Sequence, residues 1–137
     1  MNKKTFTIRC LALVTALNIA SLTYAADIVV VMAPGAAALS KDQVANLYLG
    51  RSTDLTPLDL PESSAVREAF YKLATDRGAA QVKAVWARLT FTGQGKPPKE
   101  IADAAAVKKA VAADPKAVGY IEKSEADATV KIVLALP

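Results

Sequence analysis

Two short stretches of the sequence combine residue types and positions that suit oxyanion binding. Ser40 and the pair Ser63-Ser64 each come directly before a segment with helical periodicity. Helix starts carry unpaired backbone N–H groups and the positive end of the helix dipole, and both favour an anion. A serine hydroxyl there can donate to a phosphate-like oxygen without a metal. Serine is also a leading N-cap residue regardless of function, so ordinary helix capping is the alternative interpretation at both places.

Charged side chains surround the second stretch. Asp59 and Glu62 repel a fully ionised ligand, unless the ligand carries a proton that Asp59 accepts. Arg67 stands near the start of the expected helix as a counter-charge for a bound anion, the alternative being a surface arginine that offsets Glu62 or Glu68. The candidate ligand-binding residues are therefore Ser40, Asp59, Ser63, Ser64 and Arg67.

The composition excludes most catalytic and metal chemistry. The sequence contains no histidine, and its single cysteine, Cys10, lies in the segment that we expect to be removed. Nucleophilic catalysis that needs a histidine, zinc sites built from histidine or cysteine, and disulfides are thereby excluded. Catalysis by paired carboxylates is compatible with the composition, but no motif indicates it. We expect no enzyme activity, no catalytic residue, no metal and no cofactor.

Residues 1–25 have the order of a secretion signal: a basic start, an apolar run from Leu11 to Leu22 and small residues at Ala25 and Ala26. Cleavage after Ala25 would leave residues 26–137 as one soluble domain, periplasmic or secreted. A membrane anchor is the alternative, but Asn18 interrupts a run that is already short for a bilayer.

The net charge gives no support to nucleic-acid binding. The whole chain has 17 Lys and Arg against 13 Asp and Glu, a formal charge of +4. Lys3, Lys4 and Arg9 belong to the expected signal, so the charge of the remaining chain is only +1. A nucleic-acid-binding protein needs a basic stripe that neutralises several phosphates. The scattered charges of this sequence do not form one.

The hydrophobic pattern predicts one α/β domain without internal repeats. The run from Asp27 to Ala33 is continuously apolar and β-branched, which is typical of a central strand. Trp86, Phe70 and Tyr71 recur at helical spacing and are interpreted as core aromatics, with ligand stacking as the alternative. The expected elements are a strand at 27–33, a helix from 40 capped by Gly50, an extended piece at 55–60, helices from 64 and at 79–89, a loop at 91–98, a helix from 103, and strands at 118–121 and 130–134.

Four blocks of the sequence resemble, in order, segments of phosphate ABC transporter substrate-binding proteins. The blocks are Leu39–Arg51, Glu62–Phe70, Trp86–Gly93 and Ala113–Ile121. The resemblance implies a type II periplasmic-binding-protein-like α/β fold, with a mixed sheet flanked by helices. It also implies an oxyanion held at helix N-termini by serine and backbone N–H groups, and a transport or envelope protein as partner.

Two departures from that family keep two functions open. The larger members close two lobes around phosphate, whereas 112 residues resemble one lobe. Their phosphate-binding helix start reads Ser-Gly-Thr with an arginine four residues before the serine, whereas this sequence has Ser63-Ser64-Ala65 with Asp59 or Leu60 at the arginine position. The first hypothesis is a periplasmic phosphate-binding or oxyanion-binding module linked to ABC transport. The second is a ligand-free interaction module of the cell envelope that retains only the fold.

Overall fold

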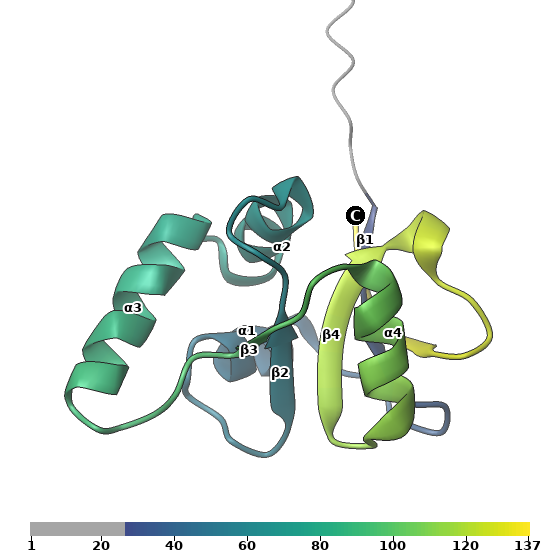
Figure 1. Ribbon diagram of the computed structural model, residues 1–137, viewed down its shortest axis with the longest axis horizontal. Coiled ribbons are helices and arrows are strands. Elements are labelled where there is room, and N and C mark those ends of the chain that lie inside the picture. The colour runs from purple at the N-terminus through teal and green to yellow at the C-terminus, as the bar shows by residue number, and fades with distance from the viewer. Residues whose placement is uncertain (1–26) are drawn as a thin grey trace, which may run out of the picture.

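The computed structural model describes residues 27–137 (Figure 1). The expected signal segment and its cleavage position after Ala25 lie outside the described residues. Within the described part of the chain, no helix is long and apolar enough to cross a membrane.

A mixed sheet of five strands forms the centre of the domain, in the order β3-β2-β4-β1-β5. Strand β1 (Ile28–Met32) pairs antiparallel with β4 (Ala117–Glu122) on one side and with β5 (Lys131–Leu136) on the other. Strand β2 (Thr56–Asp59) pairs parallel with β4 and with the two-residue strand β3 (Lys99–Glu100). Every residue of β1 is buried, as the continuous apolar run predicts for an interior strand.

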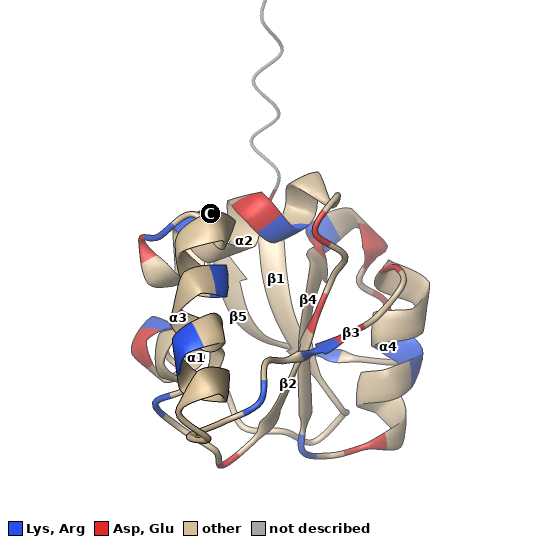
Figure 2. Cartoon of the chain, turned by 60° about the vertical axis from the view of Figure 1, so that its left-hand side comes forward, with Lys and Arg blue, Asp and Glu red and all other residues tan. Residues whose placement is uncertain are grey.

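Helices cover both faces of this sheet. Figure 2 shows α4 (Ala104–Ala113) on one side, and α1 (Lys41–Tyr48), α2 (Ala65–Thr75) and α3 (Ala79–Phe91) on the other. Helix α4 packs on β4 and β1, while α2 packs on the sheet and against both α1 and α3. A short 3-10 helix, η1 (Lys123–Glu125), connects β4 to β5. The α/β fold class and the mixed sheet flanked by helices are therefore as predicted.

Four aromatic rings form the core between α1, α2 and β4. Phe70 and Tyr120 stack with their ring centroids 3.8 Å apart, and Tyr48 meets Phe70 edge-on at 4.7 Å. Tyr71 contacts Tyr48 and Phe70 edge-on. All four side chains are fully buried. Because Tyr71 and Tyr120 belong to this rigid cluster, the positions of their hydroxyl groups are set by core packing.

The local signals at the first helix are confirmed. Ser40 and Gln43 form a capping box, in which the Ser40 hydroxyl accepts from the Gln43 N–H at 3.1 Å and the Gln43 side chain accepts from the Ser40 N–H at 2.8 Å. Gly50 follows the helix with a φ of 73°, the left-handed conformation that glycine adopts at little cost.

Two expectations differ from the structure. Phe91, predicted in a loop, lies in the last turn of α3, because the chain leaves the helix only near Gly93, where φ is 71°. Strand β3 was not expected, since Lys99 and Glu100 are exposed and show no alternating pattern. Its pairing with Leu58 and Asp59 of β2 is a tertiary contact that local sequence does not encode.

Candidate functional site

The most distinctive polar group of the domain is the buried carboxylate of Asp59, at the end of β2. Only 7% of the residue is exposed. One carboxylate oxygen accepts from the Leu60 N–H at 2.9 Å and from the Tyr120 hydroxyl, and the other accepts from the Tyr71 hydroxyl at 2.6 Å and from Arg67 Nε at 3.2 Å. A carboxylate has about four acceptor positions. All four are therefore filled by donors of the chain itself.

The two tyrosines hold this carboxylate from different elements. Tyr71 comes from α2 and Tyr120 from β4, and both hydroxyls donate to Asp59. Burial, the adjacent negative charge and these hydrogen bonds raise the pKa of Tyr71 and of Tyr120 well above that of a free tyrosine. Both hydroxyls therefore remain protonated donors throughout the physiological pH range.

Arg67 projects from the first turn of α2, and contacts hold both its backbone and its guanidinium in place. Its backbone N–H donates to the hydroxyl of the N-cap residue Ser64 at 3.3 Å, and its guanidinium lies 5.2 Å from the centre of the Tyr71 ring. Burial alone lowers the pKa of Arg67, but the charge of Asp59 and the hydrogen bond to it outweigh burial and raise that pKa. The side chain, 11% exposed, is therefore a permanent cation held by Asp59.

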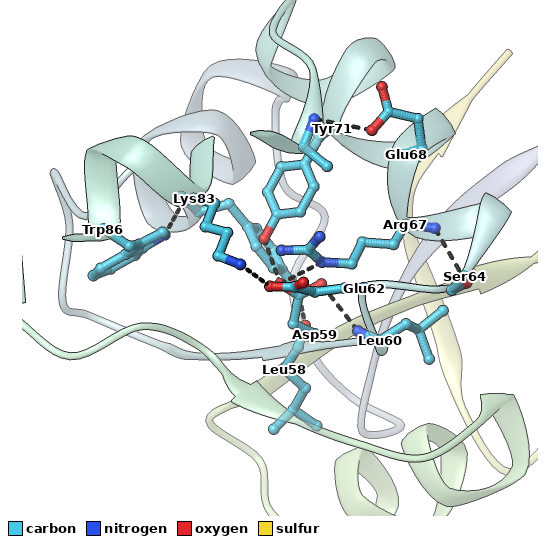
Figure 3. A network of polar contacts seen from close by, with 12 residues as sticks. Leu58, Asp59, Leu60, Glu62, Ser64, Arg67, Glu68, Tyr71, Lys83 and Trp86 are labelled. Atoms are coloured by element: carbon cyan, nitrogen blue, oxygen red, sulfur yellow. Dashed lines mark hydrogen bonds and ion pairs between the residues drawn. The ribbon is translucent and has the colours of Figure 1, made fainter. Parts of the chain in front are cut away.

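The Nη groups of Arg67 remain available to an external acceptor. Within residues 27–137 the side chain donates one hydrogen bond, from Nε to Asp59. No fully buried side-chain nitrogen of the described residues lacks a partner, so the Nη groups must reach solvent. Figure 3 shows the guanidinium pointing away from Ser64 and toward the ion pair of Lys83 with Glu62. The edge of the guanidinium that bears both Nη groups can therefore bind one acceptor group in a forked manner.

Arg67 lines a hollow of about 660 Å³ that lies between α3, the end of β2 and the segment that leads to β3. The exposed ion pair of Lys83 and Glu62, with a nitrogen-to-oxygen distance of 2.7 Å, lies on its wall. The indole N–H of Trp86 donates to the carbonyl of Tyr48 at 2.9 Å, so only the apolar part of this ring is left for the hollow. The lining residues are Asp59, Leu60, Glu62, Arg67, Lys83, Trp86, Ala87, Thr90, Phe91, Pro97, Pro98 and Glu100.

The structure brings some of the predicted residues together and separates others. Asp59 and Arg67 are in contact and line the hollow, while Ser63 and Ser64 do not line it. Ser64 serves as the N-cap of the helix that carries Arg67. Ser40 is the N-cap of α1 and lies near the C-terminal end of α2. The adjacent Lys41 forms an ion pair with Asp76, which is the C-cap residue of α2. An 11-residue helix is about 16 Å long, so Ser40 and Ser64 do not share a ligand.

The role expected for Asp59 changes in this geometry. A protonated ligand would need a free acceptor on the carboxylate, and all four positions are occupied. Asp59 instead positions Arg67. The sequence does not indicate that Lys83, Trp86 and Phe91 line the same hollow as Arg67, because each reaches it through the packing of α3 against α2.

Comparison with known proteins identifies the fold. No protein-family model and no curated protein matches the chain. An ABC-type phosphate transport receptor from Vibrio cholerae superimposes with a TM-score of 0.60 at 17% identity, over 78% of this chain and 45% of the receptor. A phosphate ABC transporter substrate-binding protein with bound phosphate from Clostridium perfringens gives a TM-score of 0.62 at 18% identity, over 78% of this chain and 44% of that protein. The chain thus spans less than half the length of these structures. Over the aligned part of the chain it has the same α/β fold as these two structures.

Proposed function

We propose that the protein is a receptor-like module that binds an oxyanion, with the guanidinium of Arg67 as the central donor. The observation that carries this proposal is the arrangement of Arg67 itself. Asp59 fixes the Nε side of the guanidinium, while the Nη groups face a hollow large enough for a ligand. Forked donors held in a fixed orientation bind carboxylate or phosphate oxygens more specifically than a flexible lysine does. The phosphate receptors named above support an anion as the ligand.

The charges around the hollow indicate weak binding of inorganic phosphate. Arg67 is already paired with Asp59, and Lys83 with Glu62. Glu100 adds a further carboxylate, so the hollow has one more carboxylate than it has cations. A multiply charged anion is therefore partly repelled, and a hollow that is open to solvent leaves it partly hydrated. We expect a dissociation constant for phosphate of about 0.1–1 mM or weaker, which corresponds to a binding free energy no more favourable than about −5.5 kcal/mol.

Thermal unfolding with and without phosphate tests this proposal. At about 100 times the dissociation constant, a ligand adds roughly 2.7 kcal/mol to the free energy of unfolding, which raises Tm by several degrees. Arg67→Lys keeps a cation beside Asp59 but removes the forked Nη donors, so we expect it to lose most of the phosphate-induced rise in Tm. Each variant is compared with its own ligand-free Tm, which separates binding from any change in basal stability.

Two further variants locate the site. Arg77→Lys makes the same change on an exposed arginine outside the hollow, and we expect it to respond to phosphate like the wild type. Ser63→Ala tests the alternative site at the start of α2 without removing the N-cap, which is Ser64. The proposal fails if phosphate raises the wild-type Tm no more than chloride at equal ionic strength. The Arg67 site fails if Ser63→Ala alone abolishes the response.

A second candidate function is a ligand-free interaction module of the cell envelope. It is favoured by Phe91, whose side chain is 93% exposed at the rim of the hollow. Aromatic residues are enriched at protein–protein interfaces relative to the rest of the surface. If phosphate does not raise Tm in the thermal experiment, this second candidate is favoured. A saturable response that Arg67→Lys removes would favour the oxyanion module.

We also propose that the chain is exported and cleaved after Ala25, and that it serves ABC transport from the periplasm or as a secreted protein. The order of residues 1–25 and the fold of the described domain support this localisation. Mass spectrometry of the exported protein checks it. A chain that begins at Ala26 agrees with the proposal, whereas an intact Met1 terminus in the membrane fraction contradicts it.

A further inference from the structure

We infer that the preferred ligand of this hollow is an organic acid with a single negative charge and an apolar body, such as an aromatic carboxylate. The inference rests on the proposed function, because it assigns the anionic head group to Arg67. It goes further by naming what occupies the rest of the hollow. Three independent features of the lining lead to this ligand class: its apolar walls, its supply of hydrogen-bond donors and its balance of charge.

The walls are built for an apolar group. Leu60, Trp86, Ala87, Phe91, Pro97 and Pro98 supply most of the surface around Arg67 and Lys83. The only polar atom of the Trp86 ring is already bonded to the carbonyl of Tyr48. A volume of about 660 Å³ is in the range of small-molecule sites. An inorganic anion would fill a small part of it and leave the apolar walls in contact with water.

Phe91 adds a surface that an apolar ligand would cover. Its ring is 93% exposed although it stands on the same helix as the well-packed Trp86, five residues earlier. An aromatic ligand body placed against Phe91 would remove apolar surface of that ring from water, whereas Trp86, only 9% exposed, forms part of the wall that is already packed. Such burial favours binding in proportion to the apolar area removed from water. This gain has no counterpart for phosphate or acetate.

Of the three carboxylates that line the hollow, only Glu100 makes neither an ion pair nor a hydrogen bond within residues 27–137. Asp59 has no acceptor position left, and Glu62 is paired with Lys83. The Nη groups of Arg67 supply the forked pair of donors in this lining. A ligand must therefore present acceptor oxygens to Arg67. A carboxylate fits the edge formed by the two Nη groups in a bidentate manner.

The charge balance limits an anionic ligand to a single negative charge. Asp59, Glu62 and Glu100 face the hollow together with the two cations, Arg67 and Lys83. A ligand with one charge gains the forked bond to Arg67 and meets limited repulsion, whereas a second charge adds repulsion without a further free cation. An organic cation gains from Glu100 but leaves the Nη donors of Arg67 unpartnered. The monoanion is therefore the best match.

Calorimetric titration of the purified protein tests this inference, with Trp86 fluorescence as a second readout because it is the only tryptophan of the chain. The probes are benzoate, acetate, inorganic phosphate and benzylamine. We expect benzoate to bind about tenfold or more tightly than acetate and phosphate, and benzylamine to bind more weakly than benzoate. Phe91→Ser should weaken benzoate binding several-fold and leave acetate binding unchanged. Ile132→Ser removes another exposed apolar side chain, outside the hollow, and should change neither.

The outcomes separate this inference from the proposed function. If acetate or phosphate binds as tightly as benzoate, the apolar body contributes nothing, and the inference fails while the oxyanion function stands. If benzylamine binds more tightly than benzoate, the assigned sign of the charge is wrong and both fail. Both also fail if no anion gives a saturable response. Loss of benzoate binding in Arg67→Lys together with weakening in Phe91→Ser supports both.

Discussion

Replacement of Asp59 by asparagine is expected to lower the free energy of unfolding by about 3 kcal/mol, a fall in Tm on the order of 10–20 °C. The substitution preserves shape but removes the charge that faces Arg67. It also places an N–H₂ group where one oxygen now accepts hydrogen bonds from Tyr71 and Arg67. Removing one partner of a buried ion pair is costly, because the other charge loses its compensation. Chemical denaturation followed by circular dichroism measures the loss.

Asp76→Asn is the matched control. Asp76 also forms an ion pair, with Lys41 at 3.3 Å, but 82% of its side chain is exposed. Asparagine tolerates the left-handed backbone at this position, where φ is 56°. Exposed ion pairs contribute about 0–1 kcal/mol, so this variant should stay close to the wild type. Equal losses in the two variants would show that the Asp59 network is not the stabilising feature that its burial indicates.

The second large effect is a steep loss of stability at alkaline pH. Burial is the main cause that raises the pKa of Tyr48, Tyr71 and Tyr120. A raised pKa means that the folded protein keeps protons that the unfolded chain releases above about pH 10. The stabilisation is therefore complete below pH 10 and is lost as the pH rises toward the folded-state values. Each tyrosine contributes about 1.4 kcal/mol per pH unit, so the three together give a slope of about 4 kcal/mol per pH unit.

Denaturant unfolding at a series of pH values between about 9 and 11.5 measures this slope. Tyr120→Phe should reduce it by about one third, whatever the variant's stability at neutral pH. Thr75→Val is the control, because Thr75 carries another buried hydroxyl, donating to the Tyr71 carbonyl at 2.6 Å, that does not titrate. Its slope should equal that of the wild type. An unchanged slope in Tyr120→Phe would contradict the assignment of the alkaline loss to these tyrosines.

The sequence predicts those parts of the fold that depend on short-range patterns. The apolar run at 28–32 predicts an interior strand, and the capping box at Ser40 and the glycine at position 50 mark both ends of α1. The Ser64 cap and the helical periodicity that follows it predict α2 in the same way. These signals are local in the chain, so they can be read without knowledge of the tertiary structure.

The site could be predicted only in part, because its contacts are distant in sequence. Asp59 and Arg67 are only eight residues apart, and the sequence indicates both as candidate ligand-binding residues. Tyr120, which donates to Asp59, is 61 residues away in the chain. Tyr71 and Trp86 follow a helical spacing that indicates core packing, and that spacing carries no sign of the hydroxyl or the ring face that reaches the site. The role that we propose for Arg67 therefore depends on a contact that only the structure shows, the bond from its Nε to Asp59.

An NMR titration of the nitrogen-15-labelled protein with benzoate tests the central claim, that an anion is bound by Arg67 within the hollow. The side-chain N–H signals of Arg67 and of the single tryptophan, Trp86, report directly on the head-group end and on the wall. We expect these two signals to shift together and to saturate with one dissociation constant, while the backbone amides of Ala65 and Val66 at the start of α2 shift less. Saturable shifts confined to those two amides, or no saturable shift of the Arg67 and Trp86 signals, would contradict it.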